Sequence, residues 1–232
     1  MGRALAGQPL AIGANATARL TNKLMAQRTQ LDDGRWHFQH GPIDIVIGAR
    51  GRADAMQAGH TRAWARFTTI LEELVSELAT LRQPVAQDCA LTGEIARRMW
   101  RACQPHSKVF ITPMAAVAGS VAEELIACYA MDGIKSAWVN NGGDIALHLM
   151  PGETLRIGLY ADLARLDARE IQNGVNVDGQ FEITSALPVR GVATSGWRGR
   201  SFSLGIADSV TVLARTASEA DEMRVSRYAT VA

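Results

Sequence analysis

The sequence predicts an α+β fold, in which mostly antiparallel sheets pack against helices. Runs with strand-like alternation recur along the chain, and Gly41-Pro42 divides "RWHFQHGPIDIVIGA" into the two strands of a hairpin. Helical patterns lie between clusters of such runs and do not alternate with single strands, which favours α+β over α/β. With 232 residues, 47% of them hydrophobic, the chain is long enough to bury a large core. We expect one domain over residues 25–232.

Four helices and several strands are predicted in order. A long helix over about 53–81 follows from apolar residues three and four positions apart, namely Phe67, Ile70, Leu71, Leu74, Val75 and Leu78. A second helix is expected over 93–102, then a short strand at Phe110 and Ile111. "TPMAAVAGSVAEELIACYAMDG" predicts a loop that feeds a helix stopped by Gly133. "TASEADEMRVSRYATVA" begins the last helix.

The remaining strands lie in the second half of the chain. "KSAWVNN" and "IALHLM" predict strands on either side of a glycine turn, and "LRIGLYA" predicts another. "GQFEITSALPVRGVATSG" predicts two short strands with Pro188 between them, and "SLGIADSVTVLAR" ends in a strand.

Composition excludes some classes of partner. A net charge of +1 gives no reason to expect nucleic acid or an acidic membrane as a partner, and no apolar run approaches the roughly 20 residues of a membrane helix. The three cysteines have no metal-ligand spacing, which favours a packing role in a reducing cytoplasm. Residues 1–24 are aperiodic and broken by Gln8, Pro9 and Gly13, so we expect no secretory signal and either a disordered extension or an upstream start.

Three turns rich in small residues are candidates for ligand binding. "PMAAVAGSVAEE" would place free N–H groups at a helix N-terminus, which suits a phosphate, but tight helix packing explains the same residues. "NNGGDI" offers a glycine pair, whose N–H groups could bind an anion, and an acid; a plain hairpin turn is the alternative. "GVATSGWRGRSFS" combines hydroxyls with Arg198 and Arg200, or is a solvated loop. Carboxylates suited to a hard cation are Asp144, Asp208 and Asp221.

Taken together and in this order, the segments resemble the ApbE flavin transferases, which use FAD and magnesium to attach FMN to a Thr or Ser of a target protein. "LDDGRWHFQHGPIDIVI", "FITPMAAVAGSVAEE", "VNNGGDIALHL", "GVATSG" and "SLGIADSVTVLA" are more similar still to an ApbE-like branch, the UPF0280 family. The resemblance covers about 25–221. It implies a T-fold-like architecture, with a C-terminal part shorter than the family's. It also implies a nucleotide ligand and a protein acceptor, and a homodimer is an open possibility.

The resemblance also assigns residues to the site. Those expected at FAD or FMN are Ala116, Ala118, Gly119, Ser120, Asn141, Gly142, Gly143, Asp144, Thr194, Ser195 and Gly196. Magnesium is expected on the carbonyl of Ala118 and on the carboxylate of Asp221. No catalytic residue is assigned.

Three departures from the family leave the chemistry open. Gly119 stands where the transferases have a lysine, Val225 stands where they have a metal-site threonine, and their His-Ile-x-Asp-Pro segment is absent. The sequence therefore allows three hypotheses. The first is a magnesium-dependent flavin transferase or FAD hydrolase of reduced activity. The second is a cofactor-biosynthesis protein acting on a pterin linked to tetrahydromethanopterin, and the third is a binding protein without catalysis.

Overall fold

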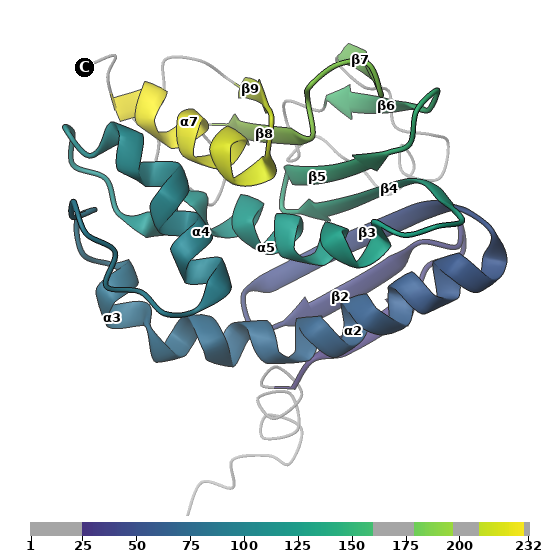
Figure 1. Ribbon diagram of the computed structural model, residues 1–232, viewed down its shortest axis with the longest axis horizontal. Helices are drawn as coiled ribbons and strands as arrows, with labels where there is room; N and C mark the ends of the chain where they lie inside the picture. Colours follow the sequence, from purple (N-terminus) through teal and green to yellow (C-terminus); the bar gives the residue numbers. More distant parts are fainter. Residues whose placement is uncertain (1–24, 160–178, 197–208, 230–232) are drawn as a thin grey trace, which may run out of the picture.

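The computed structural model describes residues 25–159, 179–196 and 209–229. Within them, a seven-stranded antiparallel sheet has the order β1-β2-β3-β4-β5-β8-β9, and β6 and β7 form a separate antiparallel pair. Helices α2, α4, α5 and α7 all lie on one face of the large sheet (Figure 1). This arrangement of antiparallel strands and helices confirms the predicted α+β class.

The strands agree closely with the sequence pattern. They are β1 (Gln27–Gln30), β2 (Trp36–His40), β3 (Ile43–Gly51), β4 (Ile134–Asn141), β5 (Asp144–Leu149), β6 (Thr154–Leu159), β7 (Gly179–Thr184), β8 (Gly191–Gly196) and β9 (Ser209–Ala214). Only β1 is not predicted. Its four residues are mostly exposed, so it has no alternation to recognise.

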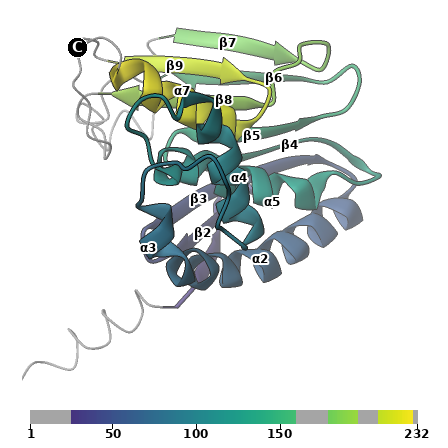
Figure 2. The same cartoon turned by 60° about the vertical axis from the view of Figure 1, so that its left-hand side comes forward.

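The helices follow the predicted order, but the one predicted over 53–81 is broken at Glu77. They are α2 (Ala53–Ser76), α3 (Leu78–Leu81), α4 (Glu94–Cys103), α5 (Val117–Ile126) and α7 (Ala217–Ala229), with 3₁₀ turns η1 (Gln104–His106), η2 (Pro113–Ala116) and η3 (Ala127–Tyr129). Helix α2 crosses beneath the sheet, whereas α5 lies between α2 and α7 (Figure 2). Helix α5 therefore packs against both α2 and α7 and connects these two helices.

Two local predictions are wrong. Phe110 and Ile111 form no strand, because Phe110 is 80% exposed and only the carbonyl of Ile111 is paired, with the N–H of Val85 at 2.9 Å. Gly133 does not stop α5, which ends at Ile126. Gly133 instead has a φ of 91° just before β4, a left-handed angle that favours glycine.

The core lies on both faces of the large sheet. On the helical face, strand residues such as Phe38, Ile47 and Val139 are fully buried in one cluster with Phe67 and Ile70 of α2. The next residues along the strands point to the opposite face, where a second cluster is formed by Leu147, Leu149, Leu155, Ile183 and Val192. Because Leu155 and Ile183 belong to β6 and β7, that strand pair packs on the face opposite the helices.

The predicted packing role of the cysteines is confirmed for Cys103, which is fully buried; Cys89 and Cys128 are half-buried, and all three are free thiols. Among the described residues, no helix is long and apolar enough to cross a membrane.

Candidate functional site at the β4–β5 turn

The glycine turn that the sequence singles out is a two-residue hairpin. Strand β4 ends at Asn141 and β5 begins at Asp144, and these two residues are paired. Gly142 and Gly143 make the whole connection with φ angles of 65° and 106°, as a type I′ turn requires. The N–H of Gly143 donates to Oδ1 of Asn140 at 2.8 Å. The glycines are thus explained by the turn itself, and one of the two amides predicted to face an anion already has a partner.

A carboxylate already lies at the N-terminus of α5, where the sequence predicts a phosphate. The N–H of Gly119 donates to Oδ2 of Asp221 at 2.9 Å, across 102 positions of sequence. Nearby, Nδ2 of Asn141 donates to the carbonyl of Ala118 at 3.1 Å. A helix N-terminus favours a negative charge, and here α7 supplies it. These two bonds join the first predicted turn to the second and to Asp221.

Asp144, Asp221 and Arg224 form a buried charge cluster beside this junction, with side chains only 5%, 2% and 9% exposed. Nη2 of Arg224 lies 2.5 Å from Oδ1 of Asp221 and 3.5 Å from Oδ2 of Asp144. Oδ1 of Asp144 has no hydrogen-bond partner among the described residues. The sequence prediction missed Arg224, although its spacing of three from Asp221 on a helix was a usable signal.

The third predicted turn reaches the same place through β8. Ala193 is paired with Asp144 in the sheet, and the N–H of Thr194 donates to the carbonyl of Gly143 at 3.2 Å. The hydroxyls of Thr194 and Thr211 lie 3.1 Å apart across β8 and β9. The described parts of all three predicted turns therefore converge on Asp144 and Asp221.

The remaining predicted residues are less informative. Ala116 and Ser120 are both fully buried, and Oγ of Ser120 has no hydrogen-bond partner among the described residues. Ser195 and Gly196 lie in β8, but their side-chain surroundings fall outside what the structure describes. The predicted candidates Arg198, Arg200 and Asp208 lie outside the described residues altogether. The ligand roles of all these residues stay predictions.

Burial sets the charge state of the cluster. It raises the pKa of Asp144 to about 8, and the negative charge of Asp221 adds to this effect while Arg224 opposes it. Burial also raises the pKa of Asp221, although Arg224 and the N–H of Gly119 act in the opposite direction. At neutral pH one proton on this carboxylate pair leaves a single negative charge, which the charge of Arg224 balances. The cluster is then neutral, as a buried site requires.

A pH dependence of stability follows from Asp144. Its pKa is higher in the folded chain than in the unfolded chain, so the proton it binds stabilises the fold at low pH. That stabilisation is lost as the pH rises from about 4 to the folded value of about 8. We expect the free energy of unfolding to fall with pH more steeply in the wild type than in Asp144→Asn, by at most about 1.4 kcal/mol per pH unit.

Urea unfolding at pH 5, 6, 7 and 8 measures this difference. Asp54→Asn is the matched control, because that carboxylate is exposed, pairs with Arg52 and has a lowered pKa. Equal pH slopes for Asp144→Asn and the wild type would show that Asp144 does not carry the extra proton.

Other titratable groups near the cluster are held in structural roles. Nε2 of His106 lies 3.2 Å from Oε2 of the buried Glu222. Burial, followed by the charges of Glu222 and Asp221, raises the pKa of Cys103 and keeps its thiol protonated. Cys103 is therefore unsuited to act as a nucleophile.

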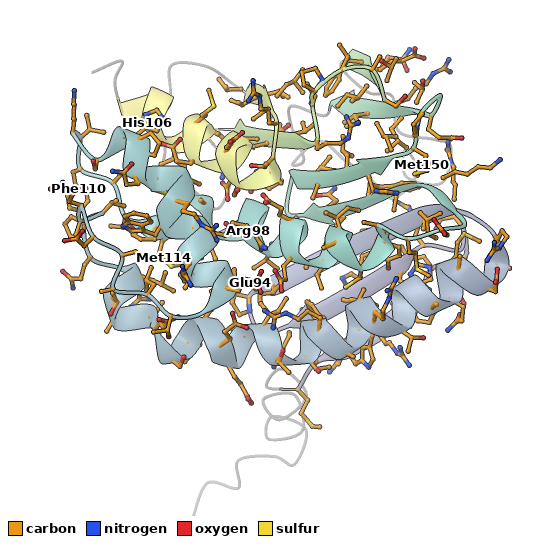
Figure 3. The ribbon with its side chains drawn as sticks, in the orientation of Figure 1. Glu94, Arg98, His106, Phe110, Met114 and Met150 are labelled. Atoms are coloured by element: carbon orange, nitrogen blue, oxygen red, sulfur yellow. The ribbon has the colours of Figure 1, made fainter. Side chains whose placement is uncertain are left out.

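The arginines beside α5 are already engaged by glutamates. Arg98 lies between α4 and α5 (Figure 3), where it contacts Glu123 at 3.4 Å and Glu124 at 2.8 Å. Arg66 of α2 also pairs with Glu124, at 2.7 Å. Together with Arg224, these arginines neutralise protein carboxylates, so none of the three is an unpaired cation ready for a phosphate.

Comparison with known proteins places the chain in a family. A family described as AbpE bacteria matches residues 27–225. A UPF0280 protein of Methanothermobacter thermautotrophicus is 32% identical over 188 residues, which are 81% of this chain and 61% of that protein. A UPF0280 protein of Methanosphaerula palustris is 38% identical over 112 residues, which are 48% of this chain and 43% of that protein. The matched region thus spans between 43% and 61% of the length of these two relatives.

Two solved structures are also similar to this chain. An ApbE protein from Thermotoga maritima is 15% identical, with a TM-score of 0.42 and coverage of 88% of this chain and 85% of that one. The apo flavinyl transferase ApbE of Pseudomonas stutzeri is 14% identical, with a TM-score of 0.42 and coverage of 87% of this chain and 84% of that one.

The family match spans most of the chain and agrees with the UPF0280 relatives. It shows that this chain belongs to the ApbE-like family, in its UPF0280 branch.

Proposed function

We propose that this protein binds a flavin nucleotide at the β4–β5 turn and cleaves FAD there, as a flavin transferase or an FAD hydrolase. In this reaction a hydroxyl oxygen, from an acceptor protein or from water, attacks the phosphorus on the FMN side. The new P–O bond forms as the bond to the bridging oxygen breaks. AMP leaves with that oxygen, and the hydroxyl proton passes to solvent. A protein acceptor, a cytoplasmic location and a homodimer remain parts of this proposal.

The observation that carries the proposal is the convergence of three distant turns on one buried carboxylate pair. Asp144 and Asp221 come from β5 and α7, and the backbone of α5 meets them through Gly119. A purely structural core would gain little from two carboxylates at such a junction, because each is costly to bury. Buried groups with strongly raised pKa values are typical of functional sites.

The magnesium predicted on Ala118 and Asp221 does not fit the arrangement of these donors. The carbonyl of Ala118 accepts from Asn141, and both oxygens of Asp221 are bonded, to Gly119 and to Arg224. Among the described residues there is no cluster of three His, Cys, Asp or Glu suited to a metal. Arg224 already places a positive charge between the two carboxylates, so no step here is assigned to a metal ion.

The decisive experiment is incubation of the purified protein with FAD, followed by chromatography of AMP and FMN. We expect AMP release by the wild type and a loss of at least about tenfold in Asp221→Asn, since the amide cannot balance Arg224. Glu219→Gln is the matched control, because it lies in the same helix at an exposed position. FAD that stays intact and unbound would refute the proposal. Parallel reactions with magnesium and with a chelator, in the wild type and in Arg224→Met, test the metal prediction directly.

A pterin is the second candidate ligand, and one observation favours it. Arg66, Arg98 and Arg224 all neutralise carboxylates of the protein, and Gly119 stands where the transferases have a lysine. A pterin has no pyrophosphate to neutralise, so it needs no additional cation. Binding of a reduced pterin without any FAD binding would select this alternative, and binding of neither would leave a protein without this cofactor chemistry.

A further inference from the structure

A cavity of about 760 Å³ lies on the sheet face opposite the helices, between the large sheet and the β6–β7 pair. The large sheet lines it with Arg50, Trp138, Asn140 and Ile145, and the β6–β7 pair lines it with Arg156 and Glu182. This volume lies in the range of roughly 300–1,000 Å³ found for small-molecule sites. The cavity is distinct from the charge cluster, because Asp144 and Ile145 are neighbours in β5 and point to opposite faces.

The floor of the cavity is an indole ring that lies flat on the sheet. Gly48 of β3 is paired with Trp138 of β4, and a Cβ on Gly48 would lie 2.0 Å from Cζ2 of that indole. It would lie 2.4 and 2.5 Å from Cε2 and Cη2, the two atoms bonded to Cζ2. The distances to Cε2 and Cη2 are only slightly longer than the distance to Cζ2, which places the Cβ position over the ring face. An approach to Cζ2 in the plane of the ring would make the distances to Cε2 and Cη2 clearly longer. One face of the indole therefore covers Gly48, and the other is directed away from the sheet.

Polar groups surround this aromatic floor. The guanidinium carbon of Arg50 lies 5.9 Å from the Trp138 ring centre, and among the described residues no carboxylate forms an ion pair with Arg50. On the opposite wall, Nε of Arg156 donates to Oε1 of Glu182 at 2.5 Å. Asn140 accepts from the turn amide of Gly143 through Oδ1 and lines the cavity, so it connects the cavity with the β4–β5 turn.

We propose that the cavity binds a planar fused heterocycle stacked on Trp138, with its polar edge toward Arg50 and the substituent that carries any phosphate toward Asn140 and the β4–β5 turn. The proposal rests on the proposed function for the identity of that ring, which is the isoalloxazine of a flavin or the bicycle of a pterin. A flat indole suits such a ring, because stacking needs an accessible ring face and no particular hydrogen-bond pattern, and the guanidinium of Arg50 over that face is the group that the ligand would displace. A glycine beneath the indole is what allows the indole to lie flat.

The test is a titration with riboflavin, which has the ring but no phosphate, and in parallel with a reduced pterin. Ligand or tryptophan fluorescence reports binding. Trp138→Ala is expected to weaken binding of the preferred ring by about tenfold, in proportion to the loss of one stacking contact. Trp100→Ala is the matched control, because that half-buried indole donates to Ala86 outside the cavity. Gly48→Ala is a second variant, in which the new methyl must displace the indole and weaken binding again.

The outcomes separate this inference from the proposed function. Riboflavin binding that depends on Trp138, in a protein that leaves FAD intact, supports the ring site and refutes the cleavage reaction. FAD cleavage together with equal riboflavin binding by Trp138→Ala and the wild type overturns the ring site alone. Failure of the wild type to bind either ring also overturns it. A preference for the pterin over riboflavin supports the site and identifies the pterin as its occupant.

Discussion

Asp221→Ala is expected to lower the free energy of unfolding by about 3–5 kcal/mol and to abolish FAD cleavage. The substitution removes the acceptor for the N–H of Gly119 and the partner of Arg224 at 2.5 Å. The contact of Arg224 with Asp144 is longer, at 3.5 Å, so Asp144 is a weaker partner for the guanidinium than the carboxylate that is lost. The main cost is a buried guanidinium that has lost its shortest ion pair.

Urea unfolding at pH 7 measures this effect, and the double variant Asp221→Ala with Arg224→Met separates its causes. The double variant is expected to be more stable than Asp221→Ala alone, because it removes the buried guanidinium together with the carboxylate that paired with it. Glu219→Ala serves as the exposed control on the same helix and should change stability by less than about 0.5 kcal/mol. If Asp221→Ala were no more destabilising than Glu219→Ala, the cluster would not be a buried ion pair.

The sequence predicts the strands and the turns well because their signals are local. The alternation in β4 and β5 and the two glycines between them define the hairpin without any distant contact. The resemblance to the ApbE family also selects Asp144 and Asp221 from the sequence alone. What it leaves open is the partner of each carboxylate, since a single arginine in a polar helix is usually solvated. Arg224 becomes part of the site only because α7 packs against β5 and α5.

The short strand predicted at Phe110 and Ile111 is wrong because a strand depends on contacts that local sequence does not reveal. Two apolar residues in sequence are compatible with a strand, but a strand also needs a neighbour that supplies hydrogen bonds. In this fold the segment precedes η2 and lies away from the sheet, so Phe110 stays exposed. Local composition does not predict which segments pair with the edge of a sheet that is distant in sequence.

Gly119→Ala is the second substitution with a large expected effect, because α5 and α7 meet backbone to backbone at this residue. A Cβ on Gly119 would lie 2.1 Å from the carbonyl oxygen of Ala217 and 2.9 Å from Cβ of Asp221. Neither neighbour is the flexible end of a side chain, so a helix has to move. We expect a loss of about 3 kcal/mol or more, at the upper end of overpacking effects. Weakening of the bond between the N–H of Gly119 and Asp221 would add to it.

Gly152→Ala is the matched control for this prediction. Gly152 has a φ of 87°, and a Cβ added to it would have no atom within 4 Å. Its replacement therefore tests backbone strain without any clash, at a cost of about 1 kcal/mol. Equal effects of the two substitutions in urea unfolding would mean that α7 does not lie against Gly119.

The same contact bears on the lysine that the transferases have at this position. The sequence leaves open whether the small residues of α5 admit a ligand or a helix, and at Gly119 the helix α7 is what approaches. Gly119→Lys should therefore destabilise the protein at least as much as Gly119→Ala. It should not place the positive charge of the transferases' lysine beside a phosphate. A stable Gly119→Lys variant with increased FAD cleavage would instead show that α7 can move aside to admit the nucleotide.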